Sequence, residues 1–389
     1  MLASPYSLHT SRPVVLGIIG GGQLAKMTAQ AAYRLGLGIA VIEHGADSPA
    51  GTMTKHEFTN GWTDPDELQR FIDISDIITL ENEFVNPDIL RTIAERRLVF
   101  PNADTVALVQ DKLTQKKTFT AAGIPMTTFE ELNSPEQAAD FGKKHGFPYI
   151  IKTRTLGYDG YGNITVRSEQ EAIAGYNTFT QSEEPRQVMA EQFVRFTAEL
   201  AVMVARNRRG EHVIYPCVET IQENHICRVV IAPARCSTDI HTKAQQIALA
   251  CVEAIKGVGV FGVEMFLTES GNVLFNEIAP RPHNSGHYTI EACHCSQFEN
   301  AVRAVNNLPL GSPAMLTKAA VMVNILGERP GSGVPDSITP LLRHPETAFH
   351  LYGKKDSRKG RKMGHLTVVG HDTDTVLQQA LAAANDLIW

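Results

Sequence analysis

The stretch 261-FGVEMFLTESGNVLFNEI-278 carries the clearest structural signal in the chain. Its two apolar runs are rich in aromatic and β-branched residues, and turn-forming residues separate them, so the stretch predicts a β-hairpin. A turn centred between Ser270 and Gly271 places Glu264 directly opposite Glu277. Like charges in opposed positions destabilise a sheet unless a proton or a cation lies between them. Two carboxylates so placed suit Mg²⁺, which proteins usually bind together with substrate phosphates.

The segment that follows the hairpin favours a functional site. It reads 277-EIAPRPHNSGHYT-289 and holds more charged and polar groups than an ordinary loop. Two other interpretations of the glutamate pair stay open: an acid/base couple for glycoside hydrolysis, or a solvated glutamate on the surface. His283 and His287 have HxxxH spacing, but the residues between them do not predict the helix that would align two zinc ligands.

Length and composition describe an ordinary globular protein. The 389 residues suffice for two or three domains, and a hydrophobic content of 43%, a charged content of 20% and a net charge of -6 provide no basic field to attract nucleic acid. No apolar run approaches the length that spans a membrane, and residues 1–13 lack the apolar core of a secretory signal. We expect a cytoplasmic protein with a disordered leader over residues 1–13, with a short import extension as the alternative.

The six cysteines are expected to be free thiols, because the sequence has no CxxC pair of the kind that forms zinc sites or redox motifs. Cys293-His294-Cys295 resembles a ligand set. The pattern predicts one helix over residues 289–305, however, and residues two apart on a helix point in different directions. A metal site is therefore not expected there.

Residues 14–110 alternate apolar runs with amphipathic segments, which predicts an α/β unit with a parallel sheet. Its first turn, 20-GGGQLA-25, fits the pattern GxGxxA before a helix predicted from Gln23 to Leu35, and Glu43 follows the second strand. Because this pattern is typical of dinucleotide-binding proteins, an NAD-dependent dehydrogenase is one alternative. In physical terms, the glycines let the backbone approach a phosphate-bearing ligand at a helix N-terminus.

Residues 111–205 predict a second unit, with a helix over 111–122 and strands over 149–152, 188–191 and 199–204. The loop 155-TLGYDGYGN-163 follows Lys152 and has enough glycine to close over phosphates with its backbone N–H groups. It is not a Walker A loop, and a plain glycine-rich turn is the alternative. A third unit is expected from about residue 206, with the glutamate hairpin, a helix to about Asn307 and a last α/β portion.

The chain resembles the ATP-grasp superfamily in the order of its charged residues and its glycine loop. Within this superfamily, the motifs GGGQLA, QDKLTQKKTF, GYDGYGN, FGVEMF, NEIAPRPHNSGHYT and LYGKKDSRKGRKMGH are together similar to the 5-(carboxyamino)imidazole ribonucleotide synthase family of purine biosynthesis. The resemblance covers residues from about 14 to 389. It implies a three-domain α/β architecture: a leader over 1–13, a Rossmann-like domain over 14–110, an ATP-grasp domain over 111–310 with a lid over about 123–205, and a substrate-binding portion over 311–389.

The resemblance also implies a nucleotide site. The expected ATP-binding residues are Lys112 and Lys152 at the phosphates, the loop residues Gly157, Tyr158, Asp159, Gly160, Tyr161, Gly162 and Asn163, the adenine hinge Glu191, Gln192, Phe193 and Val194, the ribose acceptor Glu199, and Gln222, Asn276 and Glu277. Glu264 and Glu277 would hold Mg²⁺ or Mn²⁺. Gln222 stands where relatives often have a nucleotide-contacting histidine, and strict strand alternation points Asn276 away from the glutamate face.

The second substrate implied by the resemblance is aminoimidazole ribonucleotide, which would be carboxylated by bicarbonate through carboxyphosphate. The expected substrate-binding residues are Gln23, Glu81, Asn284, Lys354, Arg361 and Lys362. Arg281 and Lys354 are the expected catalytic residues. The resemblance further implies a homodimer, and a separate mutase as a functional partner, because no mutase domain of the kind fused to some fungal relatives follows in this sequence.

Two enzymes and one binding module are the alternatives to this function. A formate-dependent glycinamide ribonucleotide transformylase is a sister ATP-grasp enzyme that shares the hairpin and the basic C-terminal cluster. The dehydrogenase would need nicotinamide and no glutamate hairpin. A nucleotide-binding module without catalysis is disfavoured, because no expected charged position is missing.

Overall fold

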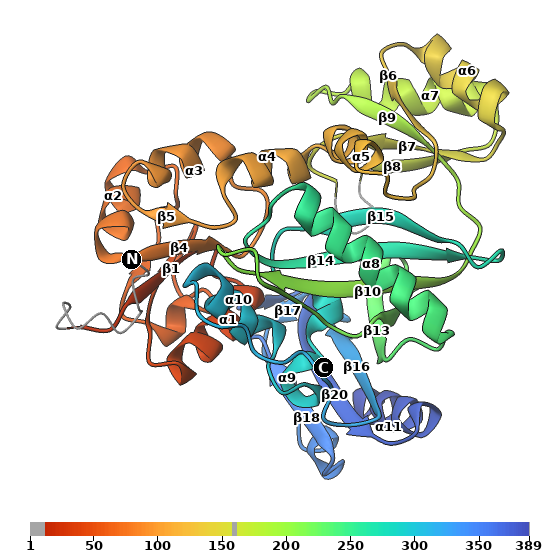
Figure 1. Ribbon diagram of the computed structural model, residues 1–389. Coiled ribbons are helices and arrows are strands. Elements are labelled where there is room, and N and C mark those ends of the chain that lie inside the picture. The colour runs from red at the N-terminus through yellow and green to blue at the C-terminus, as the bar shows by residue number, and fades with distance from the viewer. Residues whose placement is uncertain (1–11, 158–161, 389) are drawn as a thin grey trace.

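The computed structural model describes residues 12–157 and 162–388, and its N-terminal portion is a parallel sheet of five strands in the order β3-β2-β1-β4-β5 (Figure 1). The strands are β1 Val15–Ile19, β2 Gly38–Ile42, β3 Glu57–Phe58, β4 Ile77–Leu80 and β5 Leu98–Val99. The helices of this portion are α1 Gln23–Arg34, the 3₁₀ helix η1 Gly51–Met53, α2 Pro65–Ile74, α3 Pro87–Ala94 and α4 Ala103–Gln110. Every strand pair in the sheet is parallel, which confirms the predicted α/β unit.

A second, antiparallel sheet of four strands projects at the upper right of Figure 1 in the order β6-β9-β7-β8. Its strands are β6 Phe129–Leu132, β7 Tyr149–Thr153, β8 Asn163–Val166 and β9 Val188–Gln192, and its helices are α6 Pro135–His145 and α7 Glu169–Thr180. Helix α5 Lys112–Ala121 leads into this sheet from the N-terminal portion. The glycine loop connects β7 to β8, which pair as a hairpin.

The largest sheet has nine strands and joins the middle of the chain to its C-terminal portion. Its order is β15-β14-β10-β12-β13-β16-β20-β18, with β11 paired to β10. The strands are β10 Phe196–Arg206, β11 His212–Ile214, β12 Val218–Glu223, β13 Ile226–Ala232, β14 Gly259–Thr268, β15 Val273–Ala279, β16 Ala319–Leu326, β18 Thr347–Leu351 and β20 Lys362–Gly370. Because β13 pairs with β16, the last portion of the chain extends the sheet that carries the glutamate hairpin.

Helices cover this sheet at both ends. Helix α8 Thr238–Ala254 packs on β10 and β14 through a core that includes Val202, Val263 and Phe275, and α11 Thr373–Asn385 packs on β16 and β20. The remaining elements are η2 Asn284–Gly286, α9 Thr289–Ala292, α10 Gln297–Val305, η3 Leu341–Arg343 and the short pair β17 Gly331–Ser332 and β19 Asp356–Ser357. Among the described residues, no helix has the length and apolar character that a bilayer crossing requires.

The hairpin β14–β15 has the predicted opposition of Glu264 and Glu277, but its register differs from the predicted one near the turn. There Leu267 pairs with Val273, so the turn is centred one half-residue earlier than expected. The register then shifts at Asn276, where two residues of β15 oppose one of β14, as in a β-bulge. The bulge restores the pairing of the two glutamates. It also means that strict alternation does not determine the direction of the Asn276 side chain.

The predicted single helix over 289–305 is wrong, because α9 ends at Ala292 and α10 begins only at Gln297. Cys293 between them has extended backbone angles and forms a bridge with Met315. The side chain of Ser296 accepts a hydrogen bond from the Glu299 N–H and so caps α10. All six cysteines are free thiols, as predicted.

Candidate active site

Three glutamates share one face of the large sheet. Glu264 on β14 pairs with Glu277 on β15 and, across the other edge of β14, with Ala201 on β10. Because residues two apart on a strand point to the same face, Glu199 lies on this face as well. The opposite face of these strands packs against α8 through Val202, Val263 and their neighbours. The sheet therefore presents its carboxylates on the side away from the core.

The charges on this face are only partly balanced by protein groups. The ammonium of Lys112, at the start of α5, lies 2.7 Å from Glu277 Oε2 and lowers the pKa of that carboxyl. Burial raises the pKa of Glu264, and the negative charges of Glu277 and Glu199 raise it further. Glu264 and Glu277 are directly opposed on this face, and two opposed carboxylates are a donor set that fits a divalent cation such as Mg²⁺. The Glu277 side chain is 44% exposed, so a ligand can reach it.

His283 lies over the same face because Gly262 leaves room for it. A Cβ at Gly262 would lie only 2.5 Å from the His283 Cβ. The Nε2 atom of His283 is 3.5 Å from Glu264 Oε1. Burial, followed by the positive charges of Arg281 and Lys362, lowers the pKa of His283 to about 3, so the ring is neutral near pH 7. A neutral imidazole can serve Glu264 as a hydrogen-bond partner without competing with a cation for its charge.

A buried lysine pair lies beside the glycine loop. Glu191 on β9 is 2% exposed, and its carboxylate is 2.7 Å from the Nζ atoms of both Lys116 and Lys152 and accepts a hydrogen bond of 2.5 Å from Thr127 Oγ1. Burial alone would raise the pKa of Glu191, but the two ammonium groups lower it. The side chain of Glu191 is thus occupied by the two lysines. Only the backbone of Glu191 is left to contact an adenine. Lys116 was not among the expected residues, although it lies one helical turn after Lys112 in the motif QDKLTQKKTF.

The remaining expected nucleotide residues lie on β9, β10 and β12, in the connection between β9 and β10, and at the ends of the glycine loop. Gln192 ends β9, Phe193 after it is 40% exposed, and Val194 follows in the connection to β10. Glu199 accepts side-chain hydrogen bonds from Gln222 and Thr220 on β12, and burial raises its pKa. Gly157 precedes the undescribed part of the loop and Gly162 and Asn163 follow it, whereas Tyr158, Asp159, Gly160 and Tyr161 lie outside the described residues.

The glycine turn before α1 is filled by the protein's own carboxylates. Glu81, which follows β4, accepts hydrogen bonds from the N–H groups of Gly22 and Leu24, and Glu43 accepts one of 2.8 Å from the Gly21 N–H. A Cβ at Gly22 would lie 2.3 Å from Glu81 Oε1, so the glycine makes room for that carboxylate. Those N–H groups are the donors that a dinucleotide pyrophosphate would need. The turn therefore argues against the dehydrogenase.

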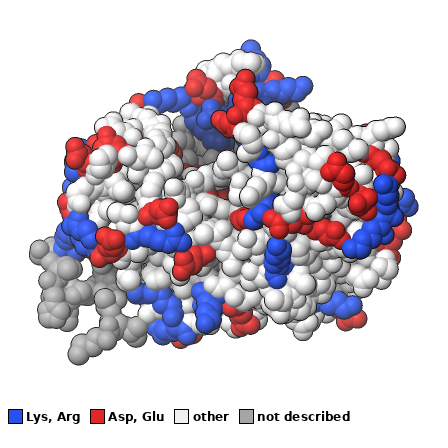
Figure 2. Space-filling model, turned by 90° about the horizontal axis from the view of Figure 1, so that it is seen from above, with Lys and Arg blue, Asp and Glu red and all other residues white. Residues whose placement is uncertain are grey.

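A basic cluster faces Glu81 from the C-terminal portion. Burial, together with the positive charges of Arg361 and Lys362, lowers the pKa of Lys354 to about 8, and the negative charge of Glu81 opposes this shift. The Arg361 guanidinium donates to the Asp356 carbonyl oxygen at 2.6 Å. Figure 2, which views the molecule from above, shows Lys, Arg, Asp and Glu side chains around a hollow in the face turned to the viewer.

Two expected residues of the motif EIAPRPHNSGHYT lie between the glutamate face and the basic cluster. Arg281 donates two hydrogen bonds to Glu83: from Nε to Oε2, and from Nη2 to Oε1 at 2.9 Å. Asn284 is buried in η2, and Gln23 is the first residue of α1. Glu83 was missed from the sequence, since nothing local to it marks a partner 198 residues away.

A histidine cluster under the site was also missed. His350 and His365, on the paired strands β18 and β20, stack with their ring planes 10° apart, and His350 Nε2 is 2.7 Å from Glu291 Oε1. These three residues are close enough to hold a metal ion. The near-parallel rings argue against one, because an ion bound by two imidazoles lies close to both ring planes. Tyr352 extends the cluster, since its hydroxyl is 3.0 Å from His365 Nδ1.

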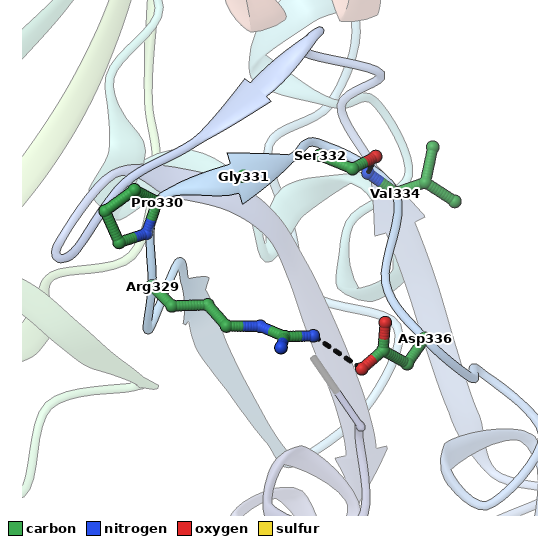
Figure 3. Close-up of a pocket in the computed structure, with 6 residues that line it drawn as sticks. All are labelled: Arg329, Pro330, Gly331, Ser332, Val334 and Asp336. Atoms are coloured by element: carbon green, nitrogen blue, oxygen red, sulfur yellow. Dashed lines mark hydrogen bonds and ion pairs between the residues drawn. The ribbon is translucent and has the colours of Figure 1, made fainter.

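A separate surface pocket of about 270 Å³ lies on the C-terminal portion, where the Arg329 side chain points to Asp336 (Figure 3). Its lining residues, Arg329, Pro330, Gly331, Ser332, Val334 and Asp336, are not among the expected site residues. The pocket is therefore not part of the candidate active site.

Three family models match consecutive parts of the chain. They are the ribonucleotide synthetase preATP-grasp domain over residues 14–110, the ATP-grasp domain over 117–298 and the phosphoribosylaminoimidazole carboxylase C-terminal domain over 320–379. Among curated proteins, the N5-carboxyaminoimidazole ribonucleotide synthase of Bacillus subtilis is 36% identical over 94% of each chain. The phosphoribosylaminoimidazole carboxylase of Schizosaccharomyces pombe is 39% identical over 92% of this chain, which spans only 65% of the length of that relative.

Solved structures agree with these matches. N5-carboxyaminoimidazole ribonucleotide synthetase from Thermus thermophilus aligns with a TM-score of 0.86 and 36% identity, over 96% of this chain and 98% of that one. N5-carboxyaminoimidazole synthase from Aspergillus clavatus, in complex with ADP and 5-aminoimidazole ribonucleotide, aligns with a TM-score of 0.86 and 34% identity over the same shares.

Proposed function

Because the chain belongs to the N5-carboxyaminoimidazole ribonucleotide synthase family, we propose that it carboxylates 5-aminoimidazole ribonucleotide with bicarbonate at the expense of ATP. The observation that carries the proposal is the opposition of Glu264 and Glu277 on an open sheet face, where Lys112, the first residue of α5, contacts Glu277. This face supports the nucleotide half of the reaction. The basic cluster around Lys354 supports the binding of a phosphorylated second substrate.

The nucleotide would bind between the four-stranded sheet and the glutamate face. Lys112 and Lys152 neutralise charge on its phosphates, and the backbone of residues 191–194 contacts the adenine. Magnesium or manganese, held by Glu264 and Glu277, would supply further positive charge to the phosphates. Phosphoryl transfer asks a protein mainly for positioning and charge neutralisation, and these residues provide both.

The chemistry follows in two steps. A bicarbonate oxygen attacks the γ-phosphorus of ATP and ADP leaves, which forms carboxyphosphate. The exocyclic amine of the ribonucleotide then bonds to the carboxylate carbon and loses a proton, and phosphate leaves with the bridging oxygen and takes up that proton. Arg281, which Glu83 holds in place, neutralises the carboxylate or the departing phosphate, and exclusion of water protects carboxyphosphate from hydrolysis.

The ribonucleotide would bind where the N-terminal and C-terminal portions meet. Lys354, Arg361 and Lys362 suit a phosphate dianion, whereas Gln23 and Asn284 suit the hydroxyl and amine groups. Glu81 would contact the substrate through the lone pairs of its carboxylate that the N–H groups of Gly22 and Leu24 do not use.

We extend the proposal to the organisation of the enzyme. Its three parts are the Rossmann-like domain over 14–110, the ATP-grasp domain over 111–310 and the C-terminal portion over 311–389. The proposal includes a cytoplasmic homodimer that is coupled in function to a mutase.

The test is the dependence of ATP hydrolysis on the second substrate. With Mg²⁺ and bicarbonate present, aminoimidazole ribonucleotide should stimulate ADP release, and glycinamide ribonucleotide with formate should not. Glu277→Gln should lose the stimulated activity, while Glu269→Gln, in the exposed turn of the same hairpin, should keep it. If glycinamide ribonucleotide with formate stimulates ADP release and aminoimidazole ribonucleotide does not, the enzyme is instead the sister transformylase.

A further inference from the structure

Lys26 connects the first helix of the chain to the segment that presents Lys354. Its ammonium, on α1, donates hydrogen bonds to the carbonyl oxygens of Leu351 at 3.0 Å and Tyr352 at 3.1 Å. Leu351 ends β18, and Tyr352 leads to Gly353 and Lys354. Lys26 thus joins two parts of the chain that are 325 residues apart, directly beside a residue of the proposed substrate site.

The contact is stronger than an ordinary hydrogen bond and is directional. Burial lowers the pKa of Lys26, because part of its hydration is lost. The carbonyl oxygens replace that hydration, and hydrogen bonds from a charged donor are about twice as strong as neutral ones. The two acceptors belong to consecutive peptide units, so the lysine fixes the orientation of both. Lys26 therefore restrains the backbone as well as linking the two portions.

The restrained segment controls where Lys354 lies. Tyr352 is 1% exposed, its hydroxyl contacts His365 Nδ1 at 3.0 Å, and the Lys354 ammonium lies 5.8 Å from the centre of its ring. Gly353 has φ +81°, a turn that redirects the chain immediately after Tyr352. Lys26 holds the backbone of Tyr352, and His365 holds its side chain. The Tyr352 N–H also donates to the Met363 carbonyl oxygen at 2.9 Å, so loss of the Lys26 contact releases only the carbonyl side of this backbone, toward Gly353 and Lys354.

We propose that Lys26 is a positioning residue for ribonucleotide binding: it fixes the 351–354 segment so that Lys354 meets the substrate phosphate. This inference rests on the proposed function, and it predicts a selective effect. The ribonucleotide site needs the segment, whereas the nucleotide site on the glutamate face does not. Lys26 also lies three residues after Gln23 on α1, so one helix would contribute both a substrate contact and the restraint.

The experiment compares Lys26→Met with the wild type in the ribonucleotide-stimulated ATPase assay. We expect the KM for aminoimidazole ribonucleotide to rise by about tenfold or more, the scale of losing one charge-assisted hydrogen bond. The KM for ATP should stay close to the wild-type value, and urea unfolding measured in parallel should show that the variant is folded under the assay conditions. Lys26→Arg keeps a charged donor that reaches both carbonyls and should recover most of the affinity, and Lys55→Met, at an exposed lysine of the same portion, should change nothing.

The outcomes separate the positioning role from the function on which it rests. A wild-type enzyme that aminoimidazole ribonucleotide does not stimulate refutes the proposed function, and the positioning role with it. A stimulated wild type with an unchanged ribonucleotide KM in Lys26→Met overturns the positioning role alone. Equal losses for ATP and ribonucleotide would show a purely structural lysine and overturn it too. If Lys26→Met does not fold, the same criteria are applied to Lys26→Gln, which keeps an uncharged NH₂ group as donor.

Discussion

At the scale of single residues, the site consists of charged groups that are held by partners of opposite charge before any substrate arrives. Lys112 is paired with Glu277, Lys152 with Glu191, and Arg281 with Glu83. Each pair keeps a buried charge from being left without compensation, which would cost several kcal/mol. Lys354 differs, because burial and the surrounding cations lower its pKa to about 8. Its charge is therefore open to change near neutral pH.

The lowered pKa of Lys354 predicts a pH dependence of ribonucleotide binding. Below about pH 8 the side chain is an ammonium that attracts phosphate, and above that value it becomes neutral. The KM for aminoimidazole ribonucleotide should therefore rise by up to about tenfold per pH unit once the pH exceeds the pKa. Lys354→Arg, which stays charged at every pH in the range, should show a flatter profile. Identical profiles for the two enzymes would contradict the assignment, and the KM for ATP serves as the internal control.

At the scale of elements, the N-terminus of α1 shows how much the sequence can predict. The pattern GGGQLA predicts the turn and the helix, and the structure has both. It does not identify what the turn binds, because the carboxylate of Glu81 that fills it comes from a residue 59 positions away. The glutamate hairpin is a similar case. Its opposed pair was predicted, whereas the bulge at Asn276 was not, since a bulge depends on packing from both sides of the sheet.

Contacts between distant segments are the part of the site that the sequence could not supply. Lys116 was within reach of prediction, because it follows Lys112 by one helical turn. The partners Thr127, Glu83 and His365 are set by how the sheets meet, and no local pattern marks them. The break in the predicted helix over 289–305 has the same origin, since Cys293 bridges to Met315 on another segment.

The cap of α1 leads to a prediction about stability. Glu81→Ala removes the carboxylate that accepts from the N–H groups of Gly22 and Leu24, so both N–H groups lose this partner. We expect the free energy of unfolding to fall by about 1–3 kcal/mol, measured by urea denaturation. Glu81→Gln retains a carbonyl oxygen at this position and should lose less. Equal stability of wild type and Glu81→Ala would show that the carboxylate does not cap the helix.

At the scale of the whole molecule, a nine-stranded sheet and the contacts of the N-terminal portion with it unite the parts. The sheet carries the glutamate face on β14 and β15 and continues to β20, whose first residue is Lys362 of the basic cluster. The N-terminal sheet meets this cluster through Glu81 and Lys26. The proposed nucleotide and ribonucleotide sites are therefore built on one continuous framework. The two sites also influence each other, because the positive charge of Lys362 in the basic cluster acts on Glu264.

The transfer of oxygen from bicarbonate to phosphate tests this account most directly. When bicarbonate attacks the γ-phosphorus, the bridging oxygen of carboxyphosphate stays with phosphorus as the second bond breaks. With bicarbonate labelled in all its oxygens by ¹⁸O, and reaction times too short for exchange with water, each turnover should release phosphate with one labelled atom, detected by mass spectrometry. Unlabelled phosphate, formed while the ribonucleotide is being carboxylated, would contradict the account and require activation of the ribonucleotide itself.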